Sequence, residues 1–492
     1  MRLRRVLVVI ACAASAACAT LLDLQPPPPE SDASGTFDAA TNDVSVPDTG
    51  GVVCAALDAA LPGDDAGTVF HPFNNGLVDD AGTSAWMFFD TSTISGGASD
   101  YSGGTFDGHY LYFAPAADGD FVRFDTTVSP FDSKNGWTTV PQASLGLKMS
   151  FRGTVFDGRY VYYVPNYNNA VAAYSGIVVR FDTTVTSFGA TSAWTTFNTQ
   201  LIAVPDGGVP ARGFFGGVFD GRYVYLSPDD NGVARDGRAA RYDTASDSGP
   251  TPVDAGDASL ATFSNVSAWL TFDIAGVNAS ALGFTGGVFD GHYVYLTPYA
   301  NGIANNGGYS PFAARYDTFD TTQGFTASSS WTTFEVDQVN GDGYGFIGAA
   351  FDGTYVYLVP FAETSVARYN TNSSFDEDSA WSVFDVSQIV HVDGGQPRFG
   401  NAAFDGRFIY LLPDLPGLGV VLRYDTLSTF TSLCAWSTDD VSHYNAQATQ
   451  FNGAVYDGRY LYLVPSLSTF ARFDTKTPQH MPSLPAFSGS FY

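Results

Sequence analysis

The fold of this chain is decided by a short stretch at residues 156–165, which reads FDGRYVYYVP. Its triplet Phe-Asp-Gly occurs seven times, once with Tyr in place of Phe, and each copy precedes an aromatic run that stops at Pro. The triplets start at Phe106, Phe156, Phe219, Phe289, Phe351, Phe404 and Tyr456. A repeated unit of about fifty to seventy residues indicates a modular fold built from one supersecondary element.

Two further motifs recur in the same register. The motif Arg-aromatic-Asp/Asn-Thr begins at Arg123, Arg180, Arg241, Arg315, Arg368, Arg423 and Arg472. All seven Trp residues follow the repeat as well, and they are Trp86, Trp137, Trp194, Trp269, Trp331, Trp381 and Trp436. Because three motifs each occur seven times, the chain contains seven copies of one unit.

Each unit predicts four short strands. A small-residue strand such as residues 216–219 ends at the triplet, and the Asp-Gly pair then makes a tight hairpin turn. The Tyr/Val run forms the second strand, the Arg motif ends the third, and Trp begins the fourth. The second strand is apolar on both faces, so both sides of each sheet must be covered. The sequence therefore predicts an all-β, seven-bladed β-propeller of four-stranded blades, with the glycine-rich strand innermost.

The order of the motifs also predicts how the ring closes. A Phe stands six residues before six of the Trp residues, whereas Asp80 stands there before Trp86. No third strand lies upstream of Trp86, and no Trp follows the last Arg motif at Arg472. We therefore expect the Trp86 strand to complete the last blade, which removes a free sheet edge.

The aromatic-Asp-Gly hairpin, the Tyr run, the Tyr-Asp segment and the downstream Trp together resemble kelch repeats. The resemblance extends over residues 81–475. It departs from the kelch pattern in one respect, because Pro165, Pro298 and Pro360 stand where a Gly pair is usual. The resemblance implies the propeller fold and leaves the function open.

The N-terminus predicts an exported lipoprotein. Basic residues precede an apolar run, and the segment 15–18 (SAAC) resembles a bacterial lipobox that would make Cys18 the lipidated first residue of the mature chain. Ordinary secretion with an incidental cysteine is the alternative. We expect residues 1–17 to be a signal peptide and the location to be the cell envelope, on the outer membrane or cell surface of a Gram-negative bacterium.

Composition separates a tether from the folded part. Residues 19–80 contain eleven acids, no Lys or Arg, and four consecutive prolines, a composition that favours an extended segment. We therefore predict a tether over 18–80, a propeller over 81–475 and a tail over 476–492. The chain has 492 residues and a formal net charge of −28, which argues against a nucleic-acid partner.

Candidate binding residues lie where the seven units differ. Asp and Arg residues that recur in every unit are expected to be structural. The variable loops share one face with the start of the inner strands, and they are the usual place for binding on a rigid fold. The candidates are Arg152, Arg212, Asp229, Asp230, Asn231, Tyr299, Asn301 and Arg398.

The sequence gives weaker indications of a metal and of a disulfide. Asp229 and Asp230, or Asp337 and Asp342, supply oxygens suited to Ca²⁺, although neither stretch has EF-hand spacing. Otherwise no cofactor is expected. In an oxidising compartment, Cys54 and Cys434 would be the two cysteines left to pair.

The function predicted is a non-catalytic binding module for a glycan, a peptide or an envelope protein, with the membrane contacted only through the lipid. Two alternatives remain. One is a carbohydrate-active enzyme with a central pocket, and the other is a purely structural surface protein. A cluster of non-repeating charged residues at the axis would favour the enzyme, whereas a flat rim of aromatic and amide side chains would favour binding.

Overall fold

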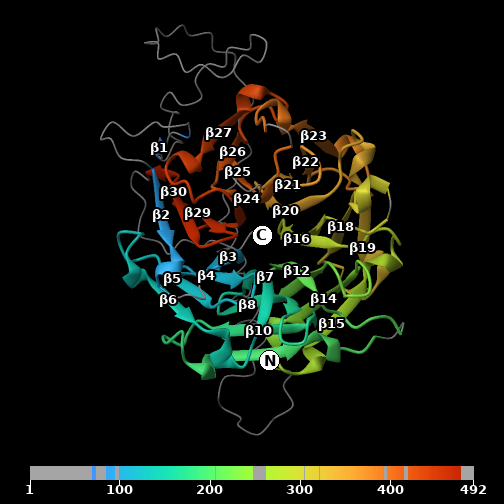
Figure 1. The fold of residues 1–492 in the computed structure, drawn as a ribbon. Helices are drawn as coiled ribbons and strands as arrows, with labels where there is room; N and C mark the ends of the chain where they lie inside the picture. The colour runs from blue at the N-terminus through green and yellow to red at the C-terminus, as the bar shows by residue number, and fades with distance from the viewer. Residues whose placement is uncertain are drawn as a thin grey trace, which may run out of the picture. The chain divides into compact units, whose positions relative to one another are not determined.

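The structure is a computed structural model, and it describes residues 69–71, 73, 85–94, 99–204, 207–247, 262–303, 305–320, 322–392, 396–414 and 419–477. These residues form seven antiparallel sheets arranged around an axis as the blades of a propeller (Figure 1). The predicted all-β, seven-bladed fold is confirmed. No described helix is long and apolar enough to cross a bilayer.

Blades 1 to 4 follow one another along the chain. Blade 1 contains β3 (Tyr101–Phe106), β4 (Tyr110–Pro115), β5 (Phe121–Asp125) and β6 (Trp137–Val140). Blade 2 contains β7 (Met149–Phe156), β8 (Tyr160–Asn168), β10 (Ile177–Asp182) and β11 (Trp194–Asn198), with β9 (Ala173–Tyr174) paired to β8. Blade 3 contains β12 (Phe214–Phe219), β13 (Tyr223–Pro228), β14 (Arg238–Asp243) and β15 (Trp269–Asp273). Blade 4 contains β16 (Phe284–Phe289), β17 (Tyr293–Pro298), β18 (Phe312–Asp317) and β19 (Trp331–Glu335).

Blades 5 to 7 complete the ring. Blade 5 contains β20 (Phe346–Phe351), β21 (Tyr355–Pro360), β22 (Ser365–Asn370) and β23 (Trp381–Asp385). Blade 6 contains β24 (Phe399–Phe404), β25 (Phe408–Pro413), β26 (Val420–Asp425) and β27 (Trp436–Asp440). Blade 7 contains β28 (Phe451–Tyr456), β29 (Tyr460–Pro465), β30 (Thr469–Asp474) and β2 (Trp86–Asp90).

The predicted ring closure is confirmed as well. Strand β2 is the outermost strand of blade 7, where Trp86 lies opposite Phe473 in an antiparallel pair. A second short pair, β1 (Val69–Phe70) with β31 (Lys476–Thr477), joins the two ends of the described chain. Both pairs occupy strand edges that would otherwise be open.

Short 3-10 turns are the helical elements among the described residues. Six of them end immediately before the Trp residues, at Lys134–Gly136, Thr191–Ala193, Val266–Ala268, Ser328–Ser330, Asp378–Ala380 and Leu433–Ala435. Seven follow the outermost strands, at Thr91–Thr93, Gln142–Leu145, Thr199–Leu201, Ile274–Gly276, Val336–Gln338, Val386–Gln388 and Val441–His443. Two others are Thr244–Asp247 and Asn305–Gly308.

The inner strands come into backbone contact around the axis, which explains their glycines. A Cβ added to Gly216 would lie 2.6 Å from Cα of Gly286 in the next blade, and one added to Gly453 would lie 2.5 Å from Cα of Gly103. Gly103, Gly216 and Gly286 also have positive φ and sit at the bulge of their inner strands. A side chain there would force neighbouring blades apart.

The Asp of the triplet is structural, as expected. In blade 2, Oδ1 of Asp157 accepts the backbone N–H groups of Arg159 and Tyr160, and Oδ2 accepts the hydroxyl of Tyr162 at 2.6 Å. The same hydroxyl contact occurs in the other six blades. The carboxylate therefore fixes the hairpin and the tyrosine that enters the core between blades.

The recurring Arg of the third strand is also structural, because it links each blade to the next. The guanidinium of Arg180 lies 3.9 Å from the ring centroid of Tyr160 in its own blade and 4.2 Å from that of Phe263 in the next blade. Its Nη1 also donates to the Tyr242 hydroxyl at 3.4 Å. Each recurring Arg stacks on a Phe ring in this way. For six of the seven Arg residues, the ring belongs to the Phe that stands six residues before the Trp of the next blade.

Phe73 supplies the seventh of these Phe rings. It lies 4.7 Å from the guanidinium of Arg423 and is fully buried against Tyr410 and Phe473. Asp80, at the expected sequence position, lies outside the described residues. Residues 69–71 and 73, placed by sequence within the tether, are therefore part of the folded ring.

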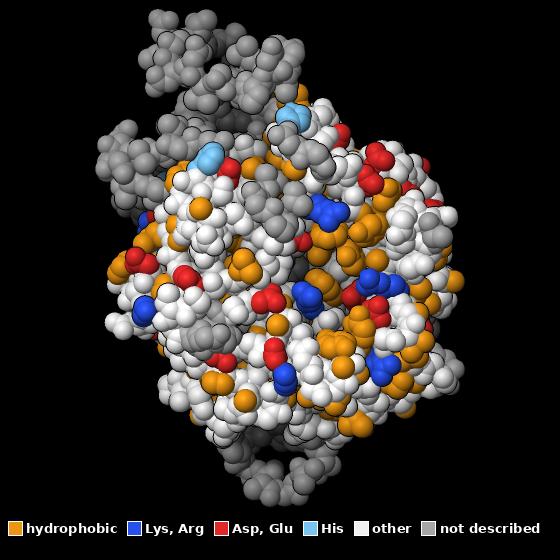
Figure 2. All heavy atoms as spheres, viewed as in Figure 1, with side chains coloured by type: hydrophobic (Ala, Val, Ile, Leu, Met, Phe, Trp, Pro, Cys, Tyr) orange, Lys and Arg blue, Asp and Glu red, His pale blue; other side chains and the backbone are white. Residues whose placement is uncertain are grey.

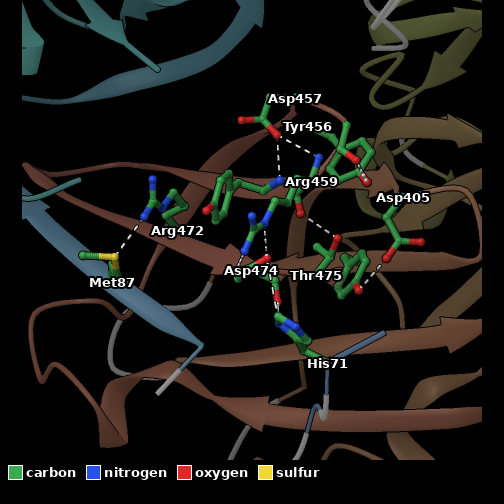
Figure 3. Close-up of polar contacts among 12 residues, drawn as sticks. His71, Met87, Asp405, Tyr456, Asp457, Arg459, Arg472, Asp474 and Thr475 are labelled. Carbon is green, nitrogen blue, oxygen red and sulfur yellow. Dashed lines mark hydrogen bonds and ion pairs between the residues drawn. The ribbon is translucent and has the colours of Figure 1, made fainter. Parts of the chain in front are cut away.

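His71 and its neighbours attach this segment to blade 7 (Figure 3). Nδ1 of His71 donates to the carbonyl oxygen of Asp474 at 2.8 Å. The Asp474 carboxylate in turn accepts Nε and Nη2 of Arg459 at 2.9 and 2.5 Å. On strand β2, Met87 accepts a contact from Nη2 of Arg472 at 2.9 Å. The two ends of the ring are thus joined by polar contacts as well as by the β pairs.

Candidate functional site

A pocket opens on the propeller axis, and its walls are the inner strands of the blades. It has a volume of about 470 Å³, including the part that is open to solvent. Figure 2 shows a hollow at the centre of one face, with side chains of both charges around it and hydrophobic side chains mostly to its right. Central hollows of this kind are common ligand sites.

The pocket is lined by the positions at which the blades differ. Each inner strand has an aromatic residue at or near its start, such as Tyr101 or Phe214, at the rim of the pocket. We call it the rim aromatic, and the residue after it faces the axis. These axial residues are Ser102, Arg152, Phe215, Thr285, Ile347, Gly400 and Asn452. Seven equivalent positions therefore carry seven different residues, whereas the aromatic residue before them recurs.

Arg152 is the one charged residue lining the pocket among the described residues. Strand β7 holds it, and its guanidinium stacks 5.3 Å from the ring centroid of Phe215 in blade 3. It forms no hydrogen bond or ion pair with a described residue. It does lower the pKa of Asp100, Asp229 and Asp414, so three carboxylates lie within electrostatic range.

Asp100 occupies a strained position at the rim. Its φ is 61°, and the equivalent positions in blades 3 to 5 are Gly213, Gly283 and Gly345 with φ of 67°, 64° and 66°. Its carboxylate accepts no hydrogen bond from a described residue. Burial raises the pKa of Asp100, and Arg152 opposes that shift. Asp is one of the few non-glycine residues that visit this conformation.

Asp414 fills space left by a glycine. A Cβ on Gly400 would lie 3.0 Å from Cβ of Asp414. Oδ1 of Asp414 accepts Nε2 of Gln450 at 2.8 Å. Burial raises the pKa of Asp414, while Gln450, Arg398 and Arg152 lower it. Asp414 is thus a half-buried acid beside the axis with one hydrogen bond among the described residues.

A row of contacting side chains extends across the loops from blade 3 to blade 6, near the mouth of the pocket. The guanidinium of Arg235 lies 5.5 Å from the ring centroid of Tyr299, and the Tyr299 ring packs on Phe361 with centroids 5.6 Å apart. At the far end, Arg398 lies 5.3 Å from the centroid of Phe361. Arg235 also pairs with Asp229, which is 7% exposed and whose pKa burial raises.

Of the predicted binding residues, Arg152 lines the pocket. Tyr299 and Arg398 belong to the row of contacts across blades 3 to 6, and Asp229 pairs with Arg235 at one end of that row. The other four form hydrogen bonds or ion pairs in the loops. Arg212 donates from Nε to the carbonyl of Asn231 at 2.6 Å, and Asp230 lies 3.9 Å from Arg235. Oδ1 of Asn231 accepts backbone N–H groups of its own turn, and that of Asn301 does the same.

The sequence did not single out Asp100, Phe215, Phe361 or Gln450 as site residues. A comparison of equivalent positions would have found Asp100, because it replaces a rim glycine of three other blades. Likewise, the residue after each rim aromatic varies in every blade.

The residues proposed for Ca²⁺ have other contacts in the structure. Asp229 pairs with Arg235, and Oδ2 of Asp337 accepts Nδ2 of Asn306 at 3.2 Å. The backbone N–H of Asp342 donates to Oδ1 of Asn340. Within the described ranges, no group of three or more His, Cys, Asp or Glu side chains is placed to hold a metal ion.

The cysteine predictions fall mainly outside the described residues. Cys434, beside Trp436, is disulfide-bonded. Cys54, its predicted partner, and Cys18, the predicted lipid attachment site, both lie outside the described residues. The pairing of Cys54 with Cys434 stays a prediction.

Comparisons with known proteins give similarities of fold. No protein-family model and no curated protein matches the chain. A streptogramin B lyase structure is 11% identical with a TM-score of 0.47, and it aligns over 79% of this chain and 97% of its own. Virginiamycin B lyase from Staphylococcus aureus is 10% identical with a TM-score of 0.48, over 79% and 98%. YCF48 bound to D1 peptide is 10% identical with a TM-score of 0.46, over 84% and 100%. Identities this low carry no information on ligand or reaction.

Proposed function

We propose that this chain is a lipid-anchored, kelch-like propeller of the cell envelope that binds a glycan, a peptide or a protein partner at its axial mouth. One observation carries the proposal. Arg152 faces the pocket without an ion pair among the described residues, at a position that differs in every blade. A guanidinium kept available beside aromatic rings is suited to recognition rather than to scaffolding.

The mouth also combines features of a binding site for polar ligands. Phe215, Tyr299 and Phe361 offer ring faces or edges, and Asn452 and Ser102 line the pocket. Sugars and peptides bind to aromatic surfaces flanked by polar groups, because their apolar faces and their polar groups are both satisfied. An all-structural role would not need a different axial residue in each blade.

A thermal-shift screen of the purified full chain tests this function. The panel contains neutral and acidic sugars, short peptides, Ca²⁺ and EDTA. A ligand that binds only the folded state must raise the melting temperature. We expect at least one sugar or peptide class to stabilise the native chain and not the Arg152→Gln variant.

The matched control is Arg222→Gln on the opposite face, where Arg222 pairs with Asp243 at 2.9 Å and is 59% exposed. It should respond like the native chain. If a ligand stabilises the native chain, Arg152→Gln and Arg222→Gln equally, it binds outside the axial mouth. No stabilisation by any class would support the structural alternative.

The enzyme alternative is favoured by one observation, the two solvent-shielded acids Asp414 and Asp229 in the loops beside the pocket. Burial raises the pKa of Asp414 and of Asp229, which is a property of general acids. Incubating the chain with each sugar that binds, followed by chromatography, tests turnover. If the native chain forms product and Asp414→Asn does not, the chain is an enzyme that uses Asp414. If the sugar stays intact, the binding module is the better description of its function.

The proposed lipid anchor and membrane location are tested separately. We propose that Cys18 carries the lipid, so Cys18→Ala should move the protein from the membrane to the soluble fraction.

The Cys54–Cys434 pairing predicts no free thiol in the unreduced, denatured mature protein. Two free thiols would refute the pairing.

A further inference from the structure

Three charged side chains at the mouth lack the partner that each would normally have. Arg152 and Asp100 form no hydrogen bond or ion pair with a described residue, and Asp414 accepts a single hydrogen bond from Gln450. Asp414 lies against Gly400, which lines the pocket, and Asp100 stands two residues before Ser102, which lines it as well. Arg152 lowers the pKa of both carboxylates, and Arg398 lowers that of Asp414 too.

Two other features mark the same part of the pocket. Asp100 keeps a left-handed backbone where three other blades use glycine. The hydroxyl of Thr154, which is 2% exposed and lines the same pocket, has no hydrogen-bond partner. Buried polar groups without partners are rare unless a ligand or a water molecule completes them.

The arrangement of charges selects the ligand. An anion would meet Arg152 but would be repelled by the two carboxylates, and a cation would meet the carboxylates but would be repelled by Arg152. A molecule that carries both charges satisfies all three groups at once. The Phe215 ring beside Arg152 adds an apolar surface for the rest of the molecule.

We propose that the axial mouth binds a small zwitterion of the amino acid or dipeptide type. Its carboxylate contacts Arg152, its ammonium group lies between Asp100 and Asp414, and its apolar part packs on Phe215. The proposal rests on the binding function inferred above and specifies the ligand class of that same site.

Isothermal titration of the full chain tests the proposal with L-leucine, L-phenylalanine and glycyl-L-leucine. The matched ligands are N-acetyl-L-leucine, which lacks the ammonium group, and L-leucinamide, which lacks the carboxylate. The protein variants are Arg152→Gln, Asp100→Asn and Asp414→Asn, with Arg222→Gln as the control. Asn tolerates the left-handed conformation, so Asp100→Asn should fold.

We expect at least one zwitterion to bind, with affinity reduced about tenfold or more by loss of either ligand charge or by Arg152→Gln. The two Asp variants should weaken binding as well, and Arg222→Gln should not. Melting curves of each variant show whether a loss of binding reflects unfolding.

Three results would overturn the proposal. One is an absence of binding by every zwitterion at millimolar concentration, and another is binding that Arg152→Gln leaves unchanged. The third is that N-acetyl-L-leucine or a neutral sugar binds as tightly as the zwitterions do, and that Arg152→Gln abolishes this binding. In that third case the ligand class is wrong, and the function proposed for the mouth survives.

Discussion

Asp100 shows how a single residue can be selected for something other than stability. Its φ of 61° is one that glycine adopts without strain and that most other residues avoid. The rest of the ring uses glycine at equivalent rim positions in blades 3 to 5. Asp is one of the few non-glycine residues that visit this conformation, so blade 1 places a carboxylate where those three blades have no side chain.

The strain can be measured by two substitutions at that position. Asp100→Ala keeps a Cβ in the left-handed conformation, so it should be less stable than Asp100→Gly by about 1 kcal/mol. Urea denaturation of the two variants measures the difference. If alanine were as stable as glycine, the left-handed conformation would not be imposed on residue 100.

Asp236 makes the stability of blade 3 depend on pH. Its side chain is buried, its Oδ2 has no hydrogen-bond partner, and burial raises its pKa to about 6. Asp273 reinforces the shift, whereas Arg238 and Asn231 oppose it. Because the fold favours the neutral acid, this stabilisation is complete below about pH 4 and is lost as the pH rises through 6.

Asp236→Asn should therefore flatten the pH dependence. The decrease in melting temperature between pH 4.5 and 7.5 should be smaller in this variant than in the native chain. Asp118→Asn, at an exposed acid, is the control and should not change that decrease. An unaltered slope in Asp236→Asn would mean that Asp236 is already ionised at pH 4.5.

At the scale of elements, the repeat is completed by a residue from outside it. Six Trp side chains donate from Nε1 to the carbonyl of the Phe six positions earlier, at 3.0 to 3.2 Å. Trp86 instead donates to Oδ2 of Asp439 at 2.9 Å. Phe73 then provides the missing ring, so geometry is maintained although the sequence pattern is broken.

Phe73→Ala should consequently destabilise the ring as much as removal of a regular repeat Phe. We expect a loss of about 3–5 kcal/mol, similar to that of Phe375→Ala. Phe319, which is 65% exposed, gives a control in Phe319→Ala with little effect. Chemical denaturation compares the three variants, and a neutral Phe73→Ala would show that the segment before β2 is dispensable.

The strands and their order could be predicted from sequence because each depends on local chemistry. The Asp-Gly turn, the terminating Pro and the Trp that opens the fourth strand act within one unit. The role of Phe73 could not be predicted from sequence, because its partners Arg423 and Phe473 are about 350 to 400 residues away along the chain. The contacts of the predicted site residues could not be predicted either, since hydrogen bonds such as that of Arg212 to Asn231 leave no sequence pattern.

At the scale of the whole molecule, the ring is held by the pairing of β2 with β30. Deleting residues 81–92 would remove the outer strand of blade 7 and expose the edge of β30. We expect a sharp decrease in melting temperature, measured by circular dichroism. Melting at the native temperature would contradict closure by this strand.

The pairing of β2 with β30 also has a consequence for synthesis. Trp86 leaves the ribosome early, whereas Phe473, which lies opposite it in the sheet, is made nearly four hundred residues later. Blades 1 to 6 can form in sequence order, but the seventh needs both ends of the chain. Until residues 469–474 are present, the apolar strand β2 has no sheet to join, and an unpaired apolar strand promotes aggregation.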